Sequence, residues 1–200
     1  MDINLYNTIQ QWEKDQDGVF CLVDLKVMLN EDSEATLYRK LGALVKAKVL
    51  LKVKRGIYAT PSASLTTISS RIEPDSYITT GTVLAQKAII GSVPARKVQA
   101  VKIGRPRTYQ FEGGTIEHLS IAPKLYFGFI SKHGIRFATP EKAFLDVCYF
   151  YYKGKRFSFD PASDINREDL DSKLIAGYLK KYDQRFITFF NRISRHLNQD

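Results

Sequence analysis

Apolar residues recur at helical spacing over the first thirty positions of the chain. They fall on one face of a segment around residues 5–12 and on one face of a second segment around residues 22–29. The apolar positions on these two faces are Leu5, Ile9, Trp12, Leu22, Leu25, Met28 and Leu29. The pattern therefore predicts two short helices, each with one face turned toward a core.

A third helix is predicted to begin at Asp32 or Ser33. Either side chain can accept hydrogen bonds from the free N–H groups of a first helical turn. The apolar face of this helix carries Leu37, Leu41, Leu44 and Val45. The opposite face is small or polar and carries Ala35, Thr36, Arg39, Ala43 and Lys46.

Small and polar residues near the start of a helix suit contact with DNA bases. Such a helix enters the major groove end first, and bulky apolar side chains would block it. The candidate DNA-contacting residues of the third helix are Ser33, Glu34, Thr36, Arg39, Lys40 and Lys46.

A basic hairpin is predicted directly after this helix. β-Branched and aromatic residues between Val49 and Thr60 flank Lys54-Arg55-Gly56, and Gly56 can adopt the positive φ of a tight turn. Lys52, Lys54 and Arg55 would lie near its tip, where they can neutralise phosphates. Three helices followed by a basic hairpin are typical of a winged helix-turn-helix, whereas the simpler interpretation is a solvated charged helix and an ordinary hairpin.

Composition bounds the rest of the interpretation. The chain has 200 residues, 44% of them hydrophobic, and a formal net charge of +9, which favours a polyanionic partner. We expect two domains, a DNA-binding domain at residues 1–60 and a second domain at residues 61–200. No apolar run reaches the roughly 20 residues that cross a membrane, and the N-terminus is unlike a secretory signal, so a cytoplasmic protein is expected.

A second basic stretch without acids lies between residues 87 and 107. It predicts supplementary phosphate contacts, on a surface continuous with the hairpin, from Arg96, Lys97, Lys102, Arg105 and Arg107. Gly104-Arg105-Pro106-Arg107 resembles a minor-groove hook, but its position between two strand patterns favours a basic hairpin turn.

The second domain is predicted to be mixed, with an antiparallel sheet and closing helices. A helix capped by Thr79 or Thr80 comes first, a helix with Thr139 at its cap and Pro140 in its first turn follows the sheet, and two more helices close the chain. The predicted strands are Val98 to Ile103, Thr108 to Phe111, Thr115 to Ile121 and Leu125 to Ile130. The closing helices are expected at Arg167 to Lys181 and Asp183 to His196. The fold class is therefore α+β.

Catalytic and metal chemistry find little support in the sequence. The histidines, including His196, and the two cysteines lack metal-ligand spacing, so no metal or cofactor is expected and Cys21 and Cys148 are interpreted as buried free thiols. The competing class is a nucleic-acid-processing enzyme whose candidate residues would be Glu112, Glu117, His118 and Glu141. No phosphate-cradling glycine loop or paired carboxylate motif accompanies them, so we expect no enzyme.

Three segments in order carry a resemblance to a known family. They are Lys54-Arg-Gly-Ile-Tyr-Ala59, Asp75-Ser-Tyr-Ile-Thr79 and Phe137-Ala-Thr-Pro-Glu-Lys-Ala-Phe-Leu-Asp146. Over about residues 5 to 150, this order and spacing resemble the AbiEi antitoxins of abortive-infection type IV toxin–antitoxin systems. The Thr139 to Asp146 segment is interpreted as a helix start with a structural ion pair or cap, because Glu141 is favoured near a helix N-terminus.

The resemblance implies a bifunctional protein in phage defence. Its winged helix would repress its own operon at double-stranded operator DNA with inverted repeats, with two copies on the DNA. Its second domain would counteract a cognate nucleotidyltransferase-like toxin without requiring a stable complex. A third class stays open, a winged-helix transcription factor whose second domain senses a ligand or dimerises, with Tyr126, Phe127, Phe129 and Tyr149 to Tyr152 lining a pocket.

Overall fold

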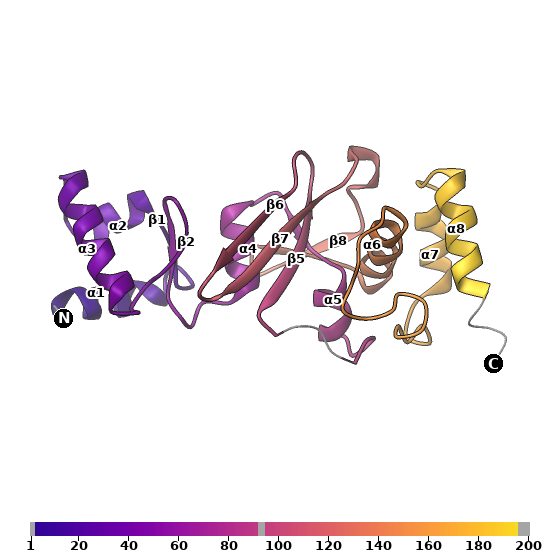
Figure 1. Cartoon of the computed structure of the whole chain (residues 1–200), viewed down its shortest axis with the longest axis horizontal. Coiled ribbons are helices and arrows are strands. Elements are labelled where there is room, and N and C mark those ends of the chain that lie inside the picture. Colours follow the sequence, from indigo (N-terminus) through magenta and orange to yellow (C-terminus); the bar gives the residue numbers. More distant parts are fainter. Residues whose placement is uncertain (1–2, 92–94, 196–200) are drawn as a thin grey trace. The chain divides into compact units, whose positions relative to one another are not determined.

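Helices and strands share the chain in a mixed α+β arrangement (Figure 1). The structure is a computed structural model and describes residues 3–91 and 95–195. Internal contacts divide the chain into one unit of Met1–Pro74 with Thr108–Ile116 and a second of Asp75–Arg107 with Glu117–Asp200. The first unit therefore includes more than the sixty residues expected for it. The functions assigned to residues 1–60 and 61–200 stay predictions.

The first unit contains the three expected helices and the expected hairpin. A three-stranded antiparallel sheet has the order β1-β3-β2. Its β1 is a strand that the sequence pattern did not predict, since three residues are too few to show a period of two. The elements are α1 (Ile3–Glu13), β1 (Val19–Cys21), α2 (Leu22–Met28), α3 (Glu34–Lys46), β2 (Leu51–Lys54), β3 (Ile57–Ala59) and α4 (Leu65–Ile72).

One apolar cluster joins the helices of the first unit to its sheet. Leu37, Leu41 and Leu44 of α3 lie in the same cluster as Phe20 of β1 and Tyr58 of β3. These side chains are almost fully buried, and burying each of the apolar ones stabilises the fold by roughly 1.5 to 3 kcal/mol. The cluster thereby fixes which face of α3 is turned to solvent.

The larger sheet contains six strands in the order β6-β7-β5-β4-β9-β8. Its elements in chain order, with the helices between them, are β4 (Tyr77–Ile78), α5 (Gly81–Gln86), β5 (Lys97–Lys102), β6 (Arg107–Phe111), β7 (Gly114–Ser120), η1 (Pro123–Leu125), β8 (Phe129–Lys132) and β9 (Ile135–Ala138). The sequence pattern predicted neither β4 nor β9, and the expected antiparallel sheet is wrong because these two strands pair in parallel. The two strands are far apart in sequence, so neither hairpin spacing nor periodicity could indicate this pairing.

The strand predicted from Leu125 to Ile130 is also wrong. A short helical turn ends at Leu125, and the strand begins only at Phe129. Gly128 between them has φ 75°, and an added Cβ would lie 3.0 Å from Cβ of Lys142. The chain therefore bends sharply at this glycine, against the helix that carries Lys142.

The predicted helix after Thr139 is confirmed. The Thr139 hydroxyl accepts a hydrogen bond from the amide of Lys142, and α6 (Pro140–Tyr152) follows. α7 (Ser172–Leu179) begins later than predicted because Asp171 caps it, accepting bonds from the amides of Lys173 and Leu174. α8 (Gln184–Arg195) matches the last prediction, except that His196 lies outside the described residues. Both closing helices pack against α6 (Figure 1).

A buried polar cluster lies under α6. Lys142 and Asp146 are fully buried and form an ion pair one helical turn apart. The other carboxylate oxygen of Asp146 accepts hydrogen bonds from Tyr77 at 3.0 Å and Thr79 at 2.8 Å. The Lys142 ammonium lies 5.0 Å from the ring centre of Phe127. Burial lowers the pKa of Lys142, and Asp146 opposes that shift.

We expect Asp146→Asn to destabilise the protein by about 3 to 5 kcal/mol at neutral pH, because it leaves a buried ammonium without a counter-charge. Loss of the carboxylate further lowers the pKa of Lys142 in the folded state, so the unfolded chain binds more protons. The deficit should therefore shrink as pH rises toward the ordinary lysine pKa of 10.5. Urea unfolding at several pH values measures it. Asp169→Asn, at an exposed position, is the matched control, and an equal effect in both variants would contradict the assignment.

Candidate nucleic-acid interface

The exposed face of α3 is polar from its first turn onward. Ser33 caps the helix, its hydroxyl accepting a hydrogen bond from the amide of Thr36 at 3.4 Å. Ser33, Glu34, Arg39 and Lys46 are exposed and Thr36 is half-buried, while the leucines face the core. The predicted cap and the predicted division of the helix into two faces are confirmed.

Lys40 differs from the other candidate residues of α3. Its ammonium lies 3.0 Å from a carboxylate oxygen of Glu31, and the side chain is half-buried. The hydrogen bond from Lys40 lowers the pKa of Glu31. The ion pair thus holds Lys40 against the segment that precedes the helix.

Tyr38 is an exposed aromatic residue that sequence reasoning did not select. Its side chain is 41% exposed on α3, between the buried Leu37 and the exposed Arg39. Gly42 and Ala43 are exposed one turn further on. The sequence did contain a signal for Tyr38, because it is an aromatic residue outside the apolar repeat of the helix. A ring at such a position can contact a partner.

The β2–β3 hairpin carries three cationic side chains. The register shifts between Lys52 and Lys54, which marks an irregularity in the strand pairing near the tip. Gly56 at the turn has φ 79°. Lys52 and Arg55 are exposed, and the half-buried Lys54 places its ammonium 5.9 Å from the ring centre of Tyr109. The predicted hairpin and its glycine turn are confirmed.

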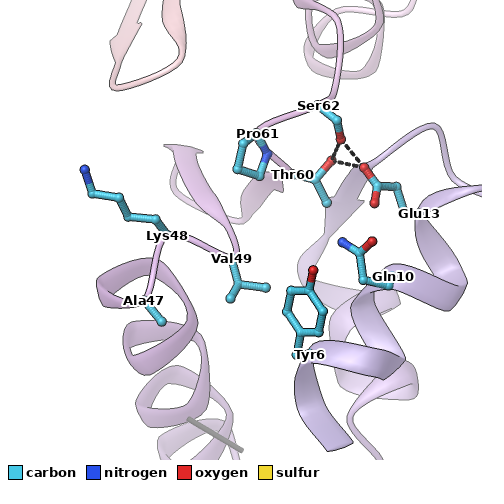
Figure 2. A pocket seen from close by; sticks show the side chains of 9 residues that line it. All are labelled: Tyr6, Gln10, Glu13, Ala47, Lys48, Val49, Thr60, Pro61 and Ser62. Atoms are coloured by element: carbon cyan, nitrogen blue, oxygen red, sulfur yellow. Dashed lines mark hydrogen bonds between the residues drawn. The ribbon is translucent and has the colours of Figure 1, made fainter. Parts of the chain in front are cut away.

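A pocket of about 410 Å³ lies between α1, the end of α3 and the segment after β3 (Figure 2). Glu13 of α1 accepts hydrogen bonds from the hydroxyls of Thr60, at 2.8 Å, and Ser62. Figure 2 shows these three side chains converging at one end of the pocket. Lys48, also in its lining, forms an ion pair with Glu112 at 3.0 Å. The two bonds of Glu13 tie the segment after β3 to α1.

The second basic stretch lies in the second unit. Arg96, Arg105 and Arg107 are exposed, and Arg105 and Arg107 lie where the chain passes from β5 to β6. The expected hairpin turn is wrong here, because β7 lies between β5 and β6 in the sheet. Lys102 is half-buried, and Lys97 pairs with Glu117 at 3.2 Å. Their contact with phosphates, and the continuity of this surface with the hairpin, stay predictions.

The residues of the competing enzyme interpretation have separate structural partners. Glu112 contacts Lys48, and Glu117 contacts Lys97 and Lys155. Glu141 accepts a hydrogen bond from the amide of Asp171 at 3.3 Å, and His118 is buried. Across residues 3–91 and 95–195, no three or more His, Cys, Asp or Glu side chains group as a metal site would require. Among the same residues, no helix has the length and apolar character to span a membrane.

The aromatic residues considered for a ligand pocket contact other rings. Tyr126 and Phe129 lie 5.0 Å apart between ring centres, and Tyr149 lies 5.8 Å from Tyr182. Both cysteines are free, as expected, but only Cys148 is buried, and Cys21 is half-buried. Burial raises the pKa of Cys148 to about 12. These rings pack against one another, and a ligand pocket lined by them stays a prediction.

Comparison with protein-family models and with curated proteins finds no match to the chain.

Two glycines near the interface should respond oppositely to alanine. An added Cβ would meet nothing within 4 Å at either Gly42 or Gly56, but only Gly56 has a positive φ. Gly56→Ala should destabilise the protein by about 1 kcal/mol through backbone strain. Gly42→Ala should stabilise it by about 0.5 to 1 kcal/mol, because alanine favours a helix interior. Chemical denaturation measures both, and equal signs would contradict the hairpin geometry.

Proposed function

We propose that the first unit is a winged helix-turn-helix that binds double-stranded DNA. Its α3 would enter the major groove, and its β2–β3 hairpin would contact adjacent phosphates. The observation that carries this proposal is that one apolar cluster holds both a helix with a polar outer face and a cationic hairpin. A helix that reads bases and a hairpin that binds the backbone need such a common support.

The order of the elements supports the proposal. A helix, a short strand, two further helices and a two-stranded hairpin follow one another, and β1 completes a sheet with the hairpin. A wing of this kind is anchored by its sheet, so its tip is free to contact a ligand.

Charge supports the same assignment. Between residues 39 and 55 the chain has no acid, and its cationic residues there are Arg39, Lys40, Lys46, Lys48, Lys52, Lys54 and Arg55. Lys40 and Lys48 are held in ion pairs. The other five cations are Arg39, Lys46, Lys52, Lys54 and Arg55, all of them exposed except the half-buried Lys54. Exposed cations that neutralise phosphates release counterions from DNA.

Two copies would bind two half-sites of an inverted repeat. Because each copy places its α3 in a major groove on one face of the duplex, the half-site centres should lie a whole number of helical turns apart. Located just upstream of its own reading frame, such an operator would make the protein a cytoplasmic autorepressor.

We further propose that the protein is an antitoxin that counteracts a nucleotidyltransferase-like toxin through its second domain. The support is the resemblance of its three segments to the AbiEi antitoxins of abortive-infection systems. The Phe137–Asp146 segment, its most specific part, forms the end of β9 and the capped start of α6. It contributes the buried Lys142–Asp146 pair and not an exposed reactive group.

Removing the wing cations tests the DNA-binding proposal. Lys54→Ala combined with Arg55→Ala should weaken binding to all duplexes alike and lower the salt slope by about 2, one for each phosphate contact. Fluorescence anisotropy at several salt concentrations measures both quantities. The control combines Lys14→Ala with Lys124→Ala, which removes the same charge at exposed positions elsewhere. If the wing variant and this control behave alike, the hairpin is not a phosphate contact.

Changes on α3 should act differently, because they alter base contacts. Replacing Thr36 or Arg39 by alanine should change the binding free energies of operator variants relative to one another. The change should be about 1 to 3 kcal/mol for variants that differ at one base position of each half-site. An equal loss of affinity for all duplexes would instead indicate that these residues contact the phosphate backbone of the DNA and not the bases.

Toxin rescue tests the antitoxin half. When a nucleotidyltransferase-like protein from an adjacent reading frame arrests growth, co-expression of the full chain should restore it. The Lys54→Ala, Arg55→Ala chain should restore growth equally when expressed from an unrelated promoter, since the wing serves DNA. Growth arrest that the full chain leaves unchanged would contradict an antitoxin function and favour a plain transcription factor.

A further inference from the structure

A small cavity in the second unit lies where α5, β5 and the segment after α6 meet. Its volume is about 60 Å³, close to the size of a single small ion or chemical group. The residues that line it are Thr82, Lys97, Gln99, Arg156, Phe157, Ser158 and Phe159.

The surroundings of this cavity are positively charged. Lys97 and Lys155 both contact the carboxylate of Glu117, and Arg156 adds a third cation in the lining. Burial raises the pKa of Glu117, but hydrogen bonds from Lys155 and Gln99 outweigh it and hold that pKa below its usual value. Two cations therefore share the ionised carboxylate of Glu117, and Arg156 adds a further positive charge, so positive charge is in excess at the cavity.

The polar groups in the lining are arranged as hydrogen-bond donors. The Thr82 hydroxyl accepts a bond from the amide of Gln99 at 3.1 Å, so its own proton is directed elsewhere. The Gln99 side-chain amide donates one proton to Glu117 at 2.8 Å and keeps its second. Ser158 and Arg156 are exposed at the cavity, and in the part of the chain that the structure describes neither forms a hydrogen bond with another protein group. The carboxylate of Glu117, in contrast, is contacted by three groups.

Backbone strain lies next to these groups. Thr80 is fully buried with φ 54° and ψ −142°, a conformation that a β-branched residue rarely adopts and that costs on the order of 1 to 3 kcal/mol. The Thr80 hydroxyl donates to the side-chain oxygen of Gln99 at 2.7 Å. With its oxygen held by Thr80 and its nitrogen facing Glu117, the Gln99 amide has a fixed orientation. Such strain is concentrated at ligand sites more than elsewhere in proteins.

We infer that this cavity binds a phosphoryl group. Excess positive charge, several unused donors and a small volume together select a compact oxyanion over a cation or an apolar ligand. Arginine and lysine beside hydroxyls form the donor set that recognises phosphate oxygens. The inference is independent of the proposed function of α3 and the wing. The phosphoryl group is that of a free phosphate compound or that of a nucleic-acid backbone.

Titration of the isotope-labelled full chain with sodium phosphate tests the inference, with sodium chloride at equal ionic strength as the reference. The backbone amides of Gln99, Arg156 and Ser158 should shift saturably in NMR spectra with phosphate and not with chloride. Arg156→Gln should raise the half-saturation concentration about tenfold or more, because a charge-assisted bond is lost. Arg185→Gln, an exposed arginine of α8, should leave it unchanged.

Ser158→Ala provides a second variant that preserves charge and should weaken phosphate binding severalfold. Shifts that do not saturate, that chloride reproduces, or that persist unchanged in both cavity variants would overturn the inference.

A competition experiment then identifies the source of the phosphoryl group. Displacement of phosphate by a duplex oligonucleotide supports a backbone phosphate, and displacement by a mononucleotide alone supports a free phosphate compound.

Discussion

The packing of α3 against the small sheet is the constraint on which the DNA-binding account depends. Leu37, Leu41 and Leu44 occupy one face of the helix and share a cluster with Phe20 and Tyr58. Because that face is fixed in the core, the small and charged residues of α3 have to face solvent, and the hairpin emerges from the same core. A large-to-small change in this cluster would cost about 2 to 5 kcal/mol and would also loosen the helix from the hairpin. Fold and proposed interface therefore rest on the same side chains.

In the second unit, buried polar networks take a comparable place. Asp146 accepts from Tyr77 and Thr79 and pairs with Lys142, so one carboxylate joins β4 to α6. Thr80, which follows Thr79 in the chain, belongs to a second network that runs through Gln99 to Glu117. A partly satisfied network in a low-dielectric interior is costly, so each donor and acceptor restricts the geometry of its neighbours. The phosphoryl site is inferred at the place where this network ends in unused donors and excess positive charge.

Local signals in the sequence predicted the local structure well. The helix faces, the Ser33 and Thr139 caps and the glycine turn at Gly56 each depend on residues a few positions apart, and each is confirmed. Features that depend on distant partners were missed. The β4–β9 pairing, the Lys48–Glu112 ion pair and the cluster around Glu117 join residues separated by dozens of positions. The Lys40–Glu31 pair was missed for another reason, since a charge pattern does not say which cation is already engaged. Sequence reasoning thus placed this helix and this hairpin along the chain, but it did not show which of their cations are held in ion pairs.

The central claim is that this chain recognises a specific DNA sequence through its first unit. The most direct measurement is a binding titration of the unmodified full chain on the DNA just upstream of its reading frame, beside a scrambled duplex of equal length. Measurements at two salt concentrations separate sequence recognition from general attraction to phosphates. The account predicts tight binding to an inverted repeat, at least about a thousandfold stronger than to the scrambled duplex. Weak binding of equal strength to both duplexes would contradict it and leave the first unit as a general polyanion-binding module.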